Sequence, residues 1–196
     1  MLSYRKLAMR VLGRPLHTGG GNDSPRPASQ RAAALVLTAA MLTTLTAPAF
    51  AKTWYIEEGD ITISAGKTEG TNKVTQGTTT DEEDTNTTIT NRDKDTPSSN
   101  TVTIKAENEN DKVEVKLEDV NIKTTGGKAA VSVTGKGDTN IELNGDNALK
   151  SDIYSSGISS SGSLTISGGE NDSLTAQGGS GADGIYSSGS LTISGG

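Results

Sequence analysis

Apolar and polar residues alternate in short runs along most of the chain after residue 60, and turn residues separate the runs. Ile61-Thr62-Ile63, Val102-Thr103-Ile104 and Val131-Ser132-Val133 are clear examples. A period of two is typical of β-strands with one buried face. The same pattern predicts strands at 87–90, 113–117, 141–143, 164–166 and 191–193. No stretch after residue 51 keeps an apolar period of 3.6, so we expect almost no helix there.

The C-terminal part of the chain contains a sequence repeat. Residues 157–169 recur as residues 184–196 at an offset of 27, and 12 of the 13 positions are identical. A diverged half-copy lies between them at 172–179. One strand and its turn cannot bury an apolar face alone, whereas stacked copies form a continuous ladder around a narrow core. The repeat therefore predicts an all-β parallel β-helix, or β-solenoid, with Gly/Ser-rich turns.

Short strands at near-regular spacing would also suit a β-sandwich. Two features favour the solenoid: the near-identical repeats, and an apolar content of only 31% with 3% aromatic residues. A solenoid core needs one or two inward aliphatic side chains per strand, whereas a sandwich core usually contains aromatic ones. Residues 77–100 are polar and acidic around the expected strand at 87–90, and we expect them to form a protruding loop.

The N-terminal region has the three parts of a secretory signal. Basic residues are spread over 1–31, an apolar run covers 32–42, and Ala49-Phe50-Ala51 has the small-residue pattern of a cleavage site. We therefore expect a helical signal peptide at 1–51, cleaved after Ala51, and a solenoid domain at 52–196. An uncleaved anchor is the alternative. The protein would be secreted, and either free or associated with the cell wall. Because the chain stops where the earlier repeat ends its turn, we expect it to be part of a longer protein.

Charge and residue types narrow the function. The leader holds six of the 18 Lys and Arg and one of the 24 Asp and Glu, so residues 52–196 carry 12 against 23, a net charge of −11. This charge disfavours nucleic acid and anionic membranes and favours cations such as Ca²⁺. The chain has no Cys, and its one His, His17, lies in the leader. Thiol nucleophiles, Ser–His–Asp triads and ordinary zinc sites are therefore excluded from the mature part.

Several segments together carry a resemblance to a known family. They include 54–63, which begins Trp54-Tyr55-Ile56, and also 74–80, 113–122, 141–151 and the two Gly-Ser-Leu-Thr-Ile-Ser-Gly-Gly copies. In this pattern the chain resembles the secreted carbohydrate-binding-domain proteins of anaerobic Gram-positive-type bacteria. The resemblance implies a Ca²⁺-containing, right-handed parallel β-helix that binds acidic polysaccharides such as polygalacturonate, the backbone of pectin. It implies no specific site residues.

Three aromatic residues and one acid are candidate site residues. Tyr154 and Tyr186 share the context Ile-Tyr-Ser-Ser-Gly, in which Tyr would point outward and could form an aromatic column for stacking sugars. Scattered surface tyrosines are the alternative. Trp54 could bind sugar, although its position favours capping the first coil. Asp183 lies in a single match, 178–186, to the Ca²⁺-binding nonapeptide of β-rolls, for which an ordinary glycine-rich turn is the favoured interpretation.

The acidic runs 81–84 and 107–111 could also attract cations, but such runs are usually only solvated. The sequence as a whole favours a non-catalytic, extracellular carbohydrate-binding or adhesive module that binds polysaccharide along a solenoid flank. One alternative is a polysaccharide lyase or hydrolase on the same fold, for which no histidine or Asp-Asp pair is present after the leader. A structural stalk is the other alternative.

Overall fold

A computed structural model of the protein describes residues 51–195. The predicted signal peptide therefore lies outside the described residues, apart from Ala51. In the described part, no helix has the length and apolar character needed to cross a membrane.

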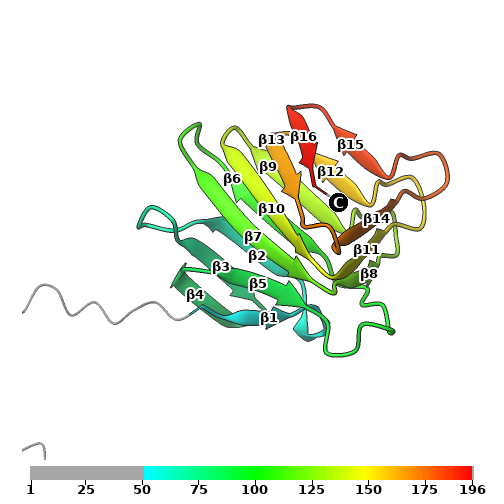
Figure 1. The fold of residues 1–196 in the computed structure, drawn as a ribbon, viewed down its shortest axis with the longest axis horizontal. Helices are drawn as coiled ribbons and strands as arrows, with labels where there is room; N and C mark the ends of the chain where they lie inside the picture. The colour runs from blue at the N-terminus through cyan, green and yellow to red at the C-terminus, as the bar shows by residue number, and fades with distance from the viewer. Residues whose placement is uncertain (1–50, 196) are drawn as a thin grey trace, which may run out of the picture. The chain divides into compact units, whose positions relative to one another are not determined.

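The described residues form sixteen strands and one short 3₁₀ segment, with no α-helix among them (Figure 1). The elements are β1 (Thr53–Tyr55), η1 (Ile56–Glu58), β2 (Ile61–Ala65), β3 (Asn72–Gln76), β4 (Thr79–Asp84), β5 (Thr87–Thr90), β6 (Val102–Ala106), β7 (Lys112–Glu118), β8 (Asn121–Lys123), β9 (Val131–Gly135), β10 (Asp138–Asn144), β11 (Asp146–Lys150), β12 (Ile158–Ser160), β13 (Ser163–Ser167), β14 (Ser173–Gln177), β15 (Ile185–Ser187) and β16 (Leu191–Ser194). Every strand that the period of two predicts is present.

The strands build three sheets around one axis, which confirms the predicted β-solenoid, with about four turns. The six-stranded sheet has the order β1-β5-β7-β10-β13-β16, and a three-stranded sheet has the order β14-β11-β8. The seven-stranded sheet has the order β15-β12-β9-β6-β2-β3-β4. Successive coils pair in parallel, and Figure 1 shows the strands of the six-stranded sheet stacked in chain order from β1 to β16.

The 27-residue sequence repeat corresponds to one complete turn of the coil. Leu164 pairs with Leu191, Ile158 with Ile185, and Asp146 with Ser173, each at the same offset and each on a different sheet. A repeat of this length therefore brings like residues into register, as the sequence predicted.

The core consists of aligned inward-facing side chains. On the six-stranded sheet, Trp54, Ile89, Leu117 and Leu143 stand in register on neighbouring strands, and all are buried. On the seven-stranded sheet, Ile61, Val102, Val131 and Ile158 do the same. The period of two puts these side chains inside, and the parallel register stacks them. On the last coil, Leu191 and Ile193 are 39% and 59% exposed.

One antiparallel hairpin interrupts the coil. Strands β3 and β4 leave between β2 and β5, and extend the seven-stranded sheet past β2. The expectation of a loop over all of 77–100 is therefore wrong for residues 79–84, which form β4. In the acidic run of β4, the carboxylate of Asp84 is buried and contacts Trp54. Glu82 remains at the surface and forms an ion pair with Lys73. Residues 91–101 connect β5 to β6 without a named strand.

Candidate polar groove on the six-stranded sheet

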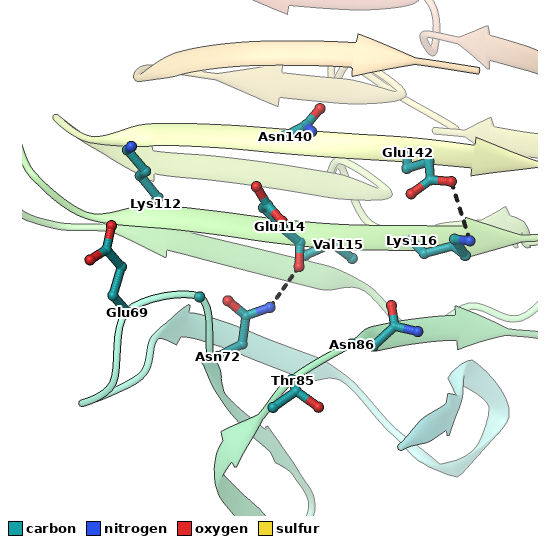
Figure 2. A pocket seen from close by; sticks show the side chains of 11 residues that line it. Glu69, Asn72, Thr85, Asn86, Lys112, Glu114, Val115, Lys116, Asn140 and Glu142 are labelled. Atoms are coloured by element: carbon teal, nitrogen blue, oxygen red, sulfur yellow. Dashed lines mark hydrogen bonds and ion pairs between the residues drawn. The ribbon is translucent and has the colours of Figure 1, made fainter. Parts of the chain in front are cut away.

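A polar groove opens beside β7 because β7 is longer than the strand next to it. Strand β5 pairs only with residues from Val115 to Glu118, so the stretch from Lys112 to Glu114 has no strand on that side. The loop before β3 and residues Thr85 and Asn86 border the gap instead. The result is a groove of about 270 Å³, shown in Figure 2.

Asn72 fixes the hairpin to the coil at the base of this groove. Its side chain is buried, and its amide nitrogen donates to the Glu114 backbone carbonyl at 2.6 Å (Figure 2). The same nitrogen donates to the Thr87 hydroxyl at 2.9 Å. The first bond satisfies a carbonyl that a strand partner would otherwise bind. The groove is therefore held open by a defined contact.

Glu83 holds the loop that forms one wall of the groove. Its carboxylate accepts hydrogen bonds from the Thr71 hydroxyl at 2.6 Å and from the backbone N–H groups of Lys67 and Thr68, both at 3.2 Å. The Thr71 hydroxyl bond, followed by those from Thr68 and Lys67, lowers the pKa of Glu83 against an opposing desolvation effect. The ionised form of Glu83 is therefore the one that orders the loop carrying Glu69.

The outward side chains of β7 and β10 line the groove with charged and amide groups. Lys116 and Glu142 form an ion pair at 3.2 Å across the two strands (Figure 2). Lys112, Glu114 and Asn140 lie along the same face, and Asn86 approaches from the opposite wall. These groups provide both donors and acceptors on rigid strands.

Asn140 has an unsatisfied polar atom at this surface. Its side-chain carboxamide oxygen is shielded from solvent and has no hydrogen-bond partner among the described residues. Buried polar atoms are nearly always paired, so an orphan acceptor needs an external donor such as water or a ligand hydroxyl. Asn140 stands opposite Glu114 on β7 and Thr165 on β13.

A second groove continues the first along the coil axis. It has a volume of about 350 Å³ and shares Lys112, Glu114 and Asn140 with the first groove. It extends to Asp138 and Thr165, so the two grooves together cross β7, β10 and β13. An elongated ligand would therefore lie across the strands and along the solenoid. The grooves contain four acidic residues (Glu69, Glu114, Asp138 and Glu142) against two lysines (Lys112 and Lys116).

The two tyrosines do not form the expected aromatic column. Tyr154 is 82% exposed at the corner after β11, with φ of 51°, and the next coil places Gly181 beside it. Tyr186 is 51% exposed on β15, in register with Ser159. Their shared pentapeptide therefore occupies different places on the coil, and Ile153 is exposed rather than inward. Each tyrosine presents a separate ring to solvent.

Trp54 occupies the capping position that the sequence favoured. Its side chain is 2% exposed, so the ring offers no free face to a sugar. Asp183 lies in an exposed turn between β14 and β15. Within residues 51–195, no three acidic or other metal-binding side chains lie close enough together to hold a metal ion.

No pattern in the sequence singles out the groove residues. The alternation shows that Glu114 and Lys116 point outward, but nothing in it shows that β5 stops short and leaves the start of β7 without a strand on that side. No family model, curated protein or solved structure matches the chain.

Proposed function

We propose that this protein is a non-catalytic, extracellular carbohydrate-binding module that holds a polysaccharide chain in the groove across β7, β10 and β13. The export pattern at the N-terminus supports a site of action outside the cell. The groove supports binding because its walls present amide, ammonium and carboxylate groups, and such groups form hydrogen bonds with sugar hydroxyls.

The observation that carries this proposal is the unpartnered carboxamide oxygen of Asn140. It sits where the two grooves meet, and a buried acceptor without a donor costs free energy in the unliganded protein. A sugar hydroxyl in the groove would supply the missing donor once the Asn140 side chain turns to present this oxygen. The length of the joined grooves favours a linear polymer over a single sugar, since successive units would contact successive strands.

The charge of the groove bears on the choice of polysaccharide. Four acidic residues face two lysines, one of which is already paired with Glu142. A polyuronate such as pectin would meet repulsion unless a divalent cation bridged the carboxylates of both partners. Binding of acidic glycans is therefore expected to need Ca²⁺, whereas binding of neutral glycans is not.

The test is retention of the purified chain on a panel of immobilised neutral and acidic polysaccharides, with Ca²⁺ and with EDTA. We expect retention on at least one polysaccharide, with EDTA abolishing retention only on the acidic ones. No reducing or unsaturated sugar should be released during long incubation. Such release would show that the protein is a hydrolase or a lyase rather than a non-catalytic binding module.

A matched pair of variants locates the site. Asn140→Ala removes the orphan amide, whereas Asn144→Ala removes an exposed amide from the same strand outside both grooves. Loss of one hydrogen bond is expected to weaken binding about fivefold for Asn140→Ala. Equal affinities of the two variants would contradict the groove as the binding site.

A further inference from the structure

The seven-stranded sheet carries a continuous row of hydroxyl groups on its outer face. Each of its seven strands places a hydroxylated residue at the same aligned position, from the hairpin edge to the last coil. The pairing runs through each neighbouring strand in turn, and the residues are Thr80, Thr75, Thr62, Thr103, Ser132, Ser159 and Tyr186. We call this set the hydroxyl column.

The hydroxyl column differs from the surfaces around it. It contains no charged residue, whereas the next outward position on the same sheet includes Lys73 and Lys105. The sequence repeat does not explain the column, because the repeat covers only β12 and β15 of this sheet, and the hairpin contributes two members. Outward positions on β7 and β10 are mostly charged.

The hydroxyls in the middle of the column are available to a ligand. Among the described residues, no hydrogen bond within the protein involves the side chain of Thr62, Thr103, Ser132 or Ser159, and each of these residues is partly exposed. The one internal contact joins the hydroxyls of Thr75 and Thr80 at 3.3 Å, at the hairpin end. A partly buried hydroxyl on a strand has already lost some side-chain freedom, so it can bind a ligand with a smaller further cost in entropy.

The spacing of the column suits an extended sugar polymer. Neighbouring strands lie about 4.8 Å apart, which is close to the length of one sugar unit in an extended chain. A hydroxyl can both donate and accept, as each sugar hydroxyl also does. At the C-terminal end the Tyr186 ring is 51% exposed, and an exposed aromatic face stacks against the apolar face of a sugar ring.

We infer that the outer face of the seven-stranded sheet is a second polysaccharide-binding surface, which takes a neutral chain lying along the coil axis. The chain makes hydrogen bonds to the hydroxyl column and stacks one unit on Tyr186. The inference rests on the proposed function in that the protein binds polysaccharide, but it uses a different flank from the groove. With both flanks occupied, one molecule would bridge two chains.

The test compares two double variants of the full chain on a neutral polysaccharide that retains the wild type. Thr103→Val with Ser132→Ala removes two hydroxyls from the column. Ser64→Ala with Thr134→Val removes two hydroxyls from the neighbouring outward position of the same sheet. We expect about 25-fold weaker binding for the first pair, as two hydrogen bonds are lost, and less than about twofold for the second.

A third variant guards against a change in folding. Tyr186→Ser installs the residue that the preceding repeat has at Ser159, so the coil itself should accept it. It is expected to weaken binding without any change in the circular dichroism spectrum or thermal midpoint.

The outcomes separate the inference from the proposed function. If the wild type binds no polysaccharide, both fail. If the wild type binds and Asn140→Ala weakens binding while the column variants match the wild type, the groove stands and the second surface is overturned. If the column variants weaken binding of neutral chains and their matched pair does not, the inference is supported.

Discussion

The indole nitrogen of Trp54 donates a hydrogen bond to the carboxylate of Asp84 at 2.9 Å, inside the protein. The same carboxylate accepts the Thr87 hydroxyl at 3.2 Å and the backbone N–H groups of Lys52 and Asn86. The first strand, the hairpin and the second coil are thus joined at one buried point. This contact closes the N-terminal end of the core.

Removing that acceptor should destabilise the protein. Asp84→Ala leaves the buried indole N–H and the Thr87 hydroxyl without an acceptor, so we expect the free energy of unfolding to fall by about 3 kcal/mol. Glu82→Ala is the control, because its ion pair with Lys73 is at the surface and is worth at most about 1 kcal/mol. Chemical denaturation of both variants measures the difference, and equal losses would show that the buried contact contributes nothing special.

The buried hydroxyl of Thr139 is expected to destabilise the fold. Thr139 faces the core between Val113 and Leu164, is 2% exposed, and its hydroxyl has no partner among the described residues. Thr139→Val keeps the shape and removes the unsatisfied group, so it should stabilise the protein by about 1 kcal/mol. The control Thr165→Val, on the outward face, should change the midpoint of urea denaturation little. A destabilised Thr139→Val protein would mean that this hydroxyl is satisfied in solution.

Gly135 is required at the turn before β10. Its φ is 108°, and a Cβ there would lie 1.9 Å from the backbone oxygen of Ala106. Gly135→Ala should therefore cost more than the roughly 1–3 kcal/mol of backbone strain alone. Gly70 also has a positive φ, of 80°, but a Cβ there would meet nothing within 4 Å. Gly70→Ala therefore measures the cost of backbone strain without a steric clash. Comparable thermal midpoints for the two variants would contradict the close packing at Gly135.

Acid should loosen the loop at the groove through Glu83. Hydrogen bonds lower the pKa of Glu83 in the folded state. Glu83 therefore contributes stability that is fully present above its unfolded-state pKa of about 4.3 and is lost as the pH falls through its lower, folded-state pKa. The thermal midpoint of the wild type should therefore exceed that of Glu83→Gln at pH 7, and the gap should shrink on acidification. A gap that grows below pH 4 would contradict this role.

The sequence was sufficient to predict the solenoid, and the reason is physical. In Ile61-Thr62-Ile63 and its counterparts, the alternation alone decides which side chains face the core, and the 27-residue repeat sets the length of a turn. Local pattern and coil register agree, so few topologies remain. The half-copy at 172–179 was a less reliable guide, because β14 lies on the three-stranded sheet and not beside its look-alike β13.

The hairpin and the groove could not be predicted in the same way. Asp81 to Asp84 has the composition of a loop, and pairing with β3 together with side-chain contacts to Trp54 and Thr71 makes a strand of it. The groove depends on a mismatch between the lengths of β5 and β7, which no residue type signals. The tyrosine column failed because identical pentapeptides at an offset of 32 are out of step with a coil of 27.

The most direct test of the account is to map the bound glycan on the protein by NMR. Backbone amide shifts of the isotopically labelled chain would be followed during titration with an oligosaccharide of the polysaccharide that it retains. The account predicts saturable changes on β7 and β10, around Lys112 to Lys116 and Asp138 to Glu142, and in Asn140→Ala these changes should need about fivefold more oligosaccharide to reach half-saturation. Saturable changes that spare both strands, or no changes at any concentration, would contradict it.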